Sequence, residues 1–274
     1  MTNMTTFISR EPSATAVVML HSSMSSKGQW KRFIAGLDDN FHPIAVDLYG
    51  YGKTAMPEHS EQFSLDDEIE RICAVIDQHL PKGAPFHLMG HSYGGAIALR
   101  LAHEQADRVL SLALFEPAAF YLLEQADPGH REISAVVAGL RQKIATDKAG
   151  ATCDFLDYWS GQGTFAAIAP NIQQVLIGQI DKVQLDFQAL LGDPLRLADL
   201  RKLDLPVCLL SGNGTTLAAK RIASLLSQTL PRVYCQSFEG GHMLPITDAE
   251  PVNAAFMKFL EESELLMRSP DLAS

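Results

Sequence analysis

Short apolar runs and helical patterns alternate along most of this 274-residue chain. The run Ala16–Leu20 is continuously apolar, as expected for a strand that is buried on both faces of a sheet. Further strands are expected at 43–46, from Phe86 onwards, and at 109–115, 207–210 and 233–238, with helical patterns between them. This alternation predicts an α/β fold in which a mostly parallel, doubly wound sheet carries helices on both faces.

The region from about residue 118 to about residue 200 breaks the alternation, because only helical periodicity is found there. One apolar stripe in it consists of Ile133, Val136, Val137, Leu140 and Ile144, and a second of Ile172, Val175, Leu176, Ile180, Val183 and Phe187. We therefore predict an all-helical cap at 118–200, inserted into a core domain made of residues 1–117 and 201–274.

Composition and charge exclude several classes of protein. With 47% hydrophobic and 20% charged residues, the chain is expected to be globular. A net charge of −10 without a basic cluster argues against nucleic acid and anionic membranes as partners. No stretch approaches the roughly 18 apolar residues of a membrane span, and residues 1–12 lack the pattern of a secretory signal. Four scattered cysteines without metal-site spacing favour a reducing, cytoplasmic setting. A homodimer is compatible with the sequence.

The most specific motif lies at the end of the predicted strand that starts at Phe86. It reads Gly90-x-Ser92-x-Gly94 and is followed by a helical pattern that opens at Ala96. A serine at such a strand-to-helix turn occupies a sharp, strained elbow that exposes its hydroxyl group. The flanking glycines are needed because a Cβ at either position would crowd the neighbouring backbone. We predict that Ser92 is a nucleophile.

A serine hydroxyl becomes a good nucleophile only when a base takes its proton, and that base needs an acid partner. Among nine histidines, His242 follows the predicted strand at 233–238 and precedes the last helical pattern. It should therefore lie at the same sheet edge as Ser92, and we predict that it is the base. His91 is expected to point away from the serine, and His21 is expected to anchor a loop.

Five segments together resemble the α/β-hydrolase-fold serine hydrolases, in the order that this family uses. They are Leu20-His-Ser-Ser23, Asp47-Leu-Tyr-Gly-Tyr-Gly52, the elbow at Ser92, the helical cap, and Gly241-His242. The resemblance spans essentially the whole chain and implies a cap-bearing, esterase-like enzyme. It also implies an oxyanion hole formed by the backbone N–H groups of Tyr93 and Ser23, although Ser22 stands where the family usually has glycine.

The third member of the expected triad departs from the family pattern. The family commonly places the acid in a Gly-x-x-Asp context after the strand before the histidine strand, whereas the segment from Gly212 to Thr216 here contains no carboxylate. A variant of the family places the acid one strand earlier, at the position of Glu116. The resemblance therefore implies Glu116 as the acid. Asp193 and Asp248 are alternatives, and a purely structural role for Glu116 at the start of a cap helix is another.

Aromatic residues of the cap, together with Ser22, are predicted to contact an apolar substrate; they are Phe120, Tyr158 and Trp159. The chain has no phosphate-binding loop, dinucleotide fingerprint or H-E-x-x-H motif, so no cofactor or metal is expected.

We predict a serine hydrolase that cleaves a small ester or related carbonyl compound. A carbon–carbon hydrolase, a perhydrolase and a lyase remain alternatives, because a shared fold does not define the reaction. A ligand-binding or signalling protein is a further alternative, favoured by the missing acid after Gly212.

Overall fold

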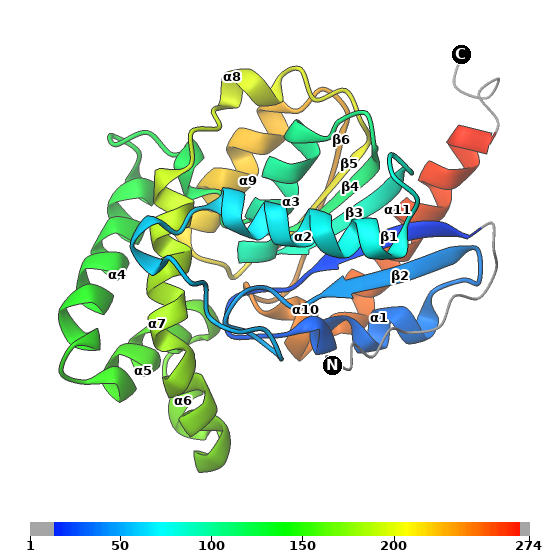
Figure 1. Ribbon diagram of the computed structural model, residues 1–274. Coiled ribbons are helices and arrows are strands. Elements are labelled where there is room, and N and C mark those ends of the chain that lie inside the picture. Colours follow the sequence, from blue (N-terminus) through cyan, green and yellow to red (C-terminus); the bar gives the residue numbers. More distant parts are fainter. Residues whose placement is uncertain (1–13, 269–274) are drawn as a thin grey trace.

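A six-stranded sheet forms the centre of the computed structural model, which describes residues 14–268 (Figure 1). Its strand order is β2-β1-β3-β4-β5-β6, and all neighbouring strands are parallel. The strands are β1 (Thr15–Leu20), β2 (Phe41–Val46), β3 (Phe86–His91), β4 (Val109–Phe115), β5 (Val207–Gly212) and β6 (Val233–Phe238). The predicted α/β fold with a parallel sheet is confirmed.

The two faces of the sheet are covered by different helices, because side chains alternate along each strand. In β1, Val18 and Leu20 join one apolar cluster, whereas Val17 and Met19 join a second cluster on the opposite face. Helices α2, α3 and α9 pack on the first face, and α1 and α11 pack on the second (Figure 1). Their bounds are Lys31–Gly36 for α1, Leu65–His79 for α2, Tyr93–Glu104 for α3, Leu217–Thr229 for α9 and Ala249–Arg268 for α11.

Only helices lie between β4 and β5, as the sequence predicts. After the 3₁₀ turn η3 (Phe120–Leu122) come α4 (Pro128–Ile144), α5 (Lys148–Ser160), α6 (Thr164–Ala167), α7 (Pro170–Gly192) and α8 (Leu197–Leu200). Helices α4 to α7 gather beside one end of the sheet (Figure 1). The division into core and cap domains stays a prediction. None of the helices in residues 14–268 has the length and apolar character that crossing a membrane requires.

The apolar stripe predicted for residues 172–187 is only partly buried. Ile180, Val183 and Phe187 are buried in the second half of α7, as expected. Ile172 and Val175, however, are 47% and 57% exposed, so the predicted helix forms but the first half of its apolar stripe is not buried. The first turns of α7 extend with α6 beyond the rest of the molecule, and helical periodicity cannot show where a helix leaves the body of the protein (Figure 1).

The carboxyl ends of the strands lie at one edge of the sheet. Leu20 at the end of β1 pairs with Gly90 of β3, and His91 pairs with Phe115 at the end of β4. The turns after β1, β3 and β4 therefore meet at this edge, as do the loops after β5 and β6. Open parallel sheets bind their ligands at such an edge.

Candidate active site

Ser92 occupies the single position between β3 and α3, and its backbone is strained. Its φ of 55° and ψ of −117° lie in a region that residues other than glycine rarely adopt. The turn closes only because its glycines lack side chains. A Cβ on Gly90 would lie 2.4 Å from the carbonyl oxygen of Gly94, and one on Gly94 would lie 2.5 Å from that of His21. The two glycines thus permit the elbow that holds Ser92 at the sheet edge.

Ser92, His242 and Glu116 form one continuous chain of hydrogen bonds. The Oγ of Ser92 lies 2.8 Å from Nε2 of His242, and Nδ1 of His242 lies 2.6 Å from Oε2 of Glu116. With the proton on Nδ1, the imidazole donates to the carboxylate and accepts from the serine. All three residues are buried, with exposed fractions of 8%, 2% and 1% respectively. The structure therefore brings together the three residues that were predicted to act together.

Two groups, one at the end of β5 and one in the loop after it, hold the carboxylate of Glu116. The backbone N–H of Gly212 donates to Oε1 at 2.7 Å, and the hydroxyl of Thr215 donates to Oε2 at 2.6 Å. This is the loop in which the sequence lacks the usual aspartate. It contributes hydrogen-bond donors to an acid that comes from β4 instead. Glu116 itself has a φ of 41°, so its backbone is strained as well.

The two alternative acids lie in other surroundings. The carboxylate of Asp193 accepts hydrogen bonds from Nε of Arg100 at 3.2 Å and from the backbone of Leu195 at 2.9 Å. Asp248 separates α10 (Leu244–Thr247) from α11. Within residues 14–268, neither of these carboxylates contacts His242.

The loop after β1 is joined to the elbow, because the N–H of Gly94 donates to the carbonyl of His21 at 3.2 Å. His21 anchors the same loop to the residues after β2, since its Nε2 accepts from the N–H of Leu48 at 3.1 Å. Burial lowers the pKa of His21 to about 4, so it is neutral at pH 7. Among residues 14–268, the backbone N–H groups of Ser23 and Tyr93 have no hydrogen-bond acceptor.

A small cavity of about 20 Å³, called here the inner cavity, lies beside Ser92. Its polar lining comes from Ser23, Ser92 and Asp186, and its aromatic lining includes Tyr93, Phe120, Phe155, Trp159 and Phe187. Of the predicted substrate contacts, Phe120 and Trp159 line this cavity. Ser22 does not, because its N–H and hydroxyl both lie 3.2 Å from Oε1 of Gln29.

Trp159 covers the imidazole of His242, with ring centroids 4.1 Å apart. It also lines an outer cavity of about 310 Å³, together with Tyr158, Thr215 and Met243. Trp159 thus contributes to the walls of both cavities. A larger hollow of about 1000 Å³ lies between β6 and α11 and includes none of the triad residues, so its size does not make it the candidate site.

His91 is a contact that the sequence reasoning missed. It does not contact Ser92 but lies against His242, with its Nε2 2.9 Å from the His242 carbonyl oxygen. On its other side, Nδ1 lies 3.2 Å from Nε2 of Gln29. Burial lowers the pKa of His91 well below its usual value, so the His91 ring is neutral while it contacts both Gln29 and His242. The sequence predicted only that His91 points away from Ser92, and it did not reveal that the loop after β6 lies against His91.

Comparisons with known proteins show which family the chain belongs to. The chain is 26% identical over 258 residues to the magnesium-chelatase 30 kDa subunit of Rhodobacter capsulatus, covering 89% of this chain and 86% of that protein. It is also 26% identical over 232 residues to a poly(3-hydroxyalkanoate) depolymerase of Ectopseudomonas oleovorans, covering 84% and 78%. The fold resembles that of the enol-lactonase from Burkholderia xenovorans LB400, with a TM-score of 0.74 at 19% identity over 90% and 92% of the two chains. The model of the alpha/beta hydrolase family matches residues 17–255. The chain therefore belongs to the alpha/beta hydrolase family.

Proposed function

We propose that this protein is a cofactor-independent serine hydrolase that cleaves a small, apolar carboxylic ester through an acyl-enzyme. The observation that carries the proposal is the unbroken hydrogen-bond chain from Ser92 through His242 to Glu116. Every group that the reaction needs is a side chain or backbone group of this chain, and water is the second substrate.

In the first half of the reaction, Oγ of Ser92 attacks the ester carbonyl while Nε2 of His242 takes the serine proton. Glu116 keeps the imidazole in the required tautomer and stabilises the imidazolium that forms. The tetrahedral intermediate then collapses, and His242 gives the proton to the departing alkoxide. The alcohol leaves, and the acyl group stays on Ser92.

Stabilisation of the developing oxyanion is assigned to the backbone N–H groups of Tyr93 and Ser23. Removing one such donor typically lowers kcat by about 10² to 10³. Both residues line the inner cavity, and Tyr93 begins α3, where the helix dipole also favours negative charge.

In the second half, His242 takes a proton from water, and the resulting hydroxide attacks the acyl carbonyl. The same two N–H groups hold the second oxyanion. When this intermediate collapses, the proton returns through His242 to Oγ of Ser92 and the carboxylic acid is released.

The lining of the inner cavity supports an apolar acyl group, since Phe120, Phe155 and Phe187 dominate its surface. At about 20 Å³ the cavity only just exceeds the roughly 10–15 Å³ that one water molecule needs, so it is too small for an ester. A substrate therefore enters only when lining side chains such as Trp159 move. An ester is further supported by the relative named as a poly(3-hydroxyalkanoate) depolymerase, because the units of that polymer are joined by ester bonds.

The missing acid after Gly212 favoured a binding protein without turnover. The contact between Glu116 and His242 weakens that argument, because an acid from β4 reaches the histidine. We therefore favour an enzyme. A cytoplasmic location, supported by the unpaired Cys73, Cys153, Cys208 and Cys235, and a homodimer are further proposals.

The test of the function is hydrolysis of p-nitrophenyl esters, together with labelling by a fluorophosphonate probe. We expect wild-type protein to hydrolyse these esters and to be labelled, whereas Ser92→Ala loses both properties because the nucleophilic oxygen is gone. Turnover retained by Ser92→Ala would exclude this mechanism. A panel that adds lactones and vinylogous diketones separates ester hydrolysis from carbon–carbon cleavage.

A further inference from the structure

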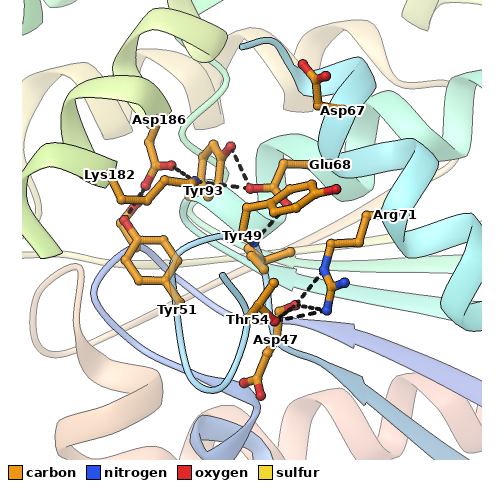
Figure 2. A network of polar contacts seen from close by, with 12 residues as sticks. Asp47, Tyr49, Tyr51, Thr54, Asp67, Glu68, Arg71, Tyr93, Lys182 and Asp186 are labelled. Atoms are coloured by element: carbon orange, nitrogen blue, oxygen red, sulfur yellow. Dashed lines mark hydrogen bonds and ion pairs between the residues drawn. The ribbon is translucent and has the colours of Figure 1, made fainter. Parts of the chain in front are cut away.

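Three charged side chains form a buried ion cluster behind the inner cavity: Glu68 of α2, with Lys182 and Asp186 of α7 (Figure 2). Nζ of Lys182 lies 3.1 Å from Oε1 of Glu68 and also contacts Oδ1 of Asp186. The three residues are at most 2% exposed. Charges buried this deeply persist only when partners satisfy them, and a purely apolar packing would often be as stable. The cluster therefore calls for a functional explanation.

Both residues of the proposed oxyanion hole are bound to this cluster through their hydroxyl groups. The hydroxyl of Ser23 donates to Oδ2 of Asp186 at 2.5 Å. The phenol of Tyr93 donates to Oε1 of Glu68 at 3.2 Å (Figure 2). Lys182 connects the two carboxylates, so a single path of polar contacts joins the two residues. Their backbone N–H groups are the ones assigned to the oxyanion.

The remaining contacts make the cluster rigid. The phenol of Tyr51 donates to Oδ2 of Asp186 at 2.5 Å, and the backbone N–H of Tyr49 donates to Oε2 of Glu68 at 3.2 Å. The ring centroids of Tyr51, Phe63 and Tyr93 lie 4.7 to 5.0 Å from the ammonium of Lys182. Burial and the neighbouring carboxylates raise the pKa of both Tyr51 and Tyr93, so their hydroxyl groups stay protonated and remain donors.

We propose that the ion cluster is the positioning device of the oxyanion hole, holding Ser23 and Tyr93 at a fixed separation. The inference rests on the proposed function. Donors to an oxyanion accelerate a reaction only when they already point at the place where charge develops. The loop of Ser23 and the helix of Tyr93 belong to different elements, and a tie between them supplies this preorganisation. Glu68 and Lys182 are thus positioning residues outside the inner cavity, and Asp186, which also lines that cavity, orients Ser23 through its hydrogen bond.

The experiment compares Ser23→Ala, Tyr93→Phe and Asp186→Asn with wild type. The first two variants each remove one hydroxyl group and keep the backbone N–H. They therefore test the hydrogen bonds to Asp186 and Glu68 without leaving a charge unpaired. We expect each variant to lower kcat for a p-nitrophenyl ester by about tenfold to a hundredfold, less than removal of a donor would, while KM stays within about threefold. Affinity for a trifluoromethyl ketone, whose adduct with Ser92 carries an oxyanion, should fall by the same factor as kcat/KM.

The matched control is Asp193→Asn. Asp193 is also a buried acid at the end of α7, paired with Arg100, but it contacts neither Ser23 nor Tyr93. Removing the charge of Asp193 should lower the midpoint of thermal unfolding without changing kcat or the affinity for the ketone. All kinetics are run well below the unfolding midpoint of each variant, so that lost stability does not register as lost activity. If Asp186→Asn does not fold, the two hydroxyl variants still decide the question.

Unchanged kcat and ketone affinity in Ser23→Ala and Tyr93→Phe, with an active wild type, would overturn the positioning role and leave the proposed function intact. Variants that lose thermal stability but keep the wild-type kcat and ketone affinity would overturn the positioning role as well. A wild type that neither hydrolyses esters nor reacts with fluorophosphonate would instead overturn the proposed function, and this inference with it.

Discussion

Backbone strain in residues 14–268 is concentrated around the candidate site. Three residues other than glycine have a positive φ: Met24, Ser92 and Glu116. Ser92 and Glu116 flank His242 on its two sides, and Met24 directly follows Ser23. Each such conformation costs roughly 1 to 3 kcal/mol and persists only where the surrounding structure holds it. The strain therefore marks the residues whose positions the fold defines most tightly.

Replacement of Glu116 by glutamine should lower kcat by about 10⁴, because the amide no longer enforces the imidazole tautomer that accepts the serine proton. Steady-state kinetics with a p-nitrophenyl ester measure this change, and the shape-matched control is Asp193→Asn. Near-normal activity in Glu116→Gln, combined with a large loss in Asp193→Asn, would transfer the role of acid to Asp193.

At the scale of elements, the helices between β4 and β5 decide what reaches His242. Trp159 of α5 lies over the imidazole and lines both the inner and the outer cavity. Phe120 of η3 stacks on Trp159 on one side and on Phe187 of α7 on the other, with centroids 6.3 and 6.1 Å apart. The inner cavity is therefore lined by three ring systems from three separate segments.

Trp159→Ala should join the two cavities and relax the selection for substrate size. We expect the ratio of kcat/KM for p-nitrophenyl octanoate to that for the acetate to rise about tenfold or more, because each extra methylene finds space that wild type denies it. Trp159→Phe, which keeps an aromatic ring over His242, serves as the control and should give an intermediate ratio. An unchanged ratio in the alanine variant would show that Trp159 does not limit entry.

Sequence reasoning succeeded where a pattern has one physical solution. Strands buried on both faces, such as β1, were evident as apolar runs, and the order of motifs placed Ser92 and His242 at one sheet edge. The role of Glu116 was expected only from the resemblance to a variant of the family, with Asp193 and Asp248 as alternatives. Sequence reasoning failed where contacts depend on tertiary packing. Ser23 and Asp186 are 163 residues apart, and the apolar periodicity of a helix does not reveal the hydrogen bond between them. The short α6, α8 and α10 are likewise too brief to show a period.

For the molecule as a whole, buried neutral histidines set a limit on acid stability. His21 has a folded pKa of about 4, lowered mainly by burial, against about 6.5 in an unfolded chain. Between these values the unfolded state binds more protons than the folded state, so the free energy of unfolding falls as the pH is lowered through this window. The pKa of His91 is also lowered by burial, and His91 adds to the effect in the same direction.

We expect the free energy of unfolding to decrease from pH 7 towards pH 4, with His21 alone contributing up to about 3 kcal/mol. Urea unfolding at several pH values measures this change. His21→Gln should be less stable than wild type at pH 7 but should have a shallower pH dependence below 6.5. The exposed His59, changed to glutamine, is the control and should leave the slope as it is. Equal slopes in wild type and His21→Gln would contradict this account.

The ion cluster also restricts how this enzyme could be rebuilt. Two of its three charges, Lys182 and Asp186, come from the helical insertion, whereas Glu68 comes from the sheet-covering helix α2. A chimaera that exchanged the insertion for one from a relative lacking this lysine would leave the carboxyl of Glu68 buried beside Tyr93 without its cation. The insertion is therefore not an interchangeable module, and any graft onto this scaffold has to carry a compensating change at Glu68.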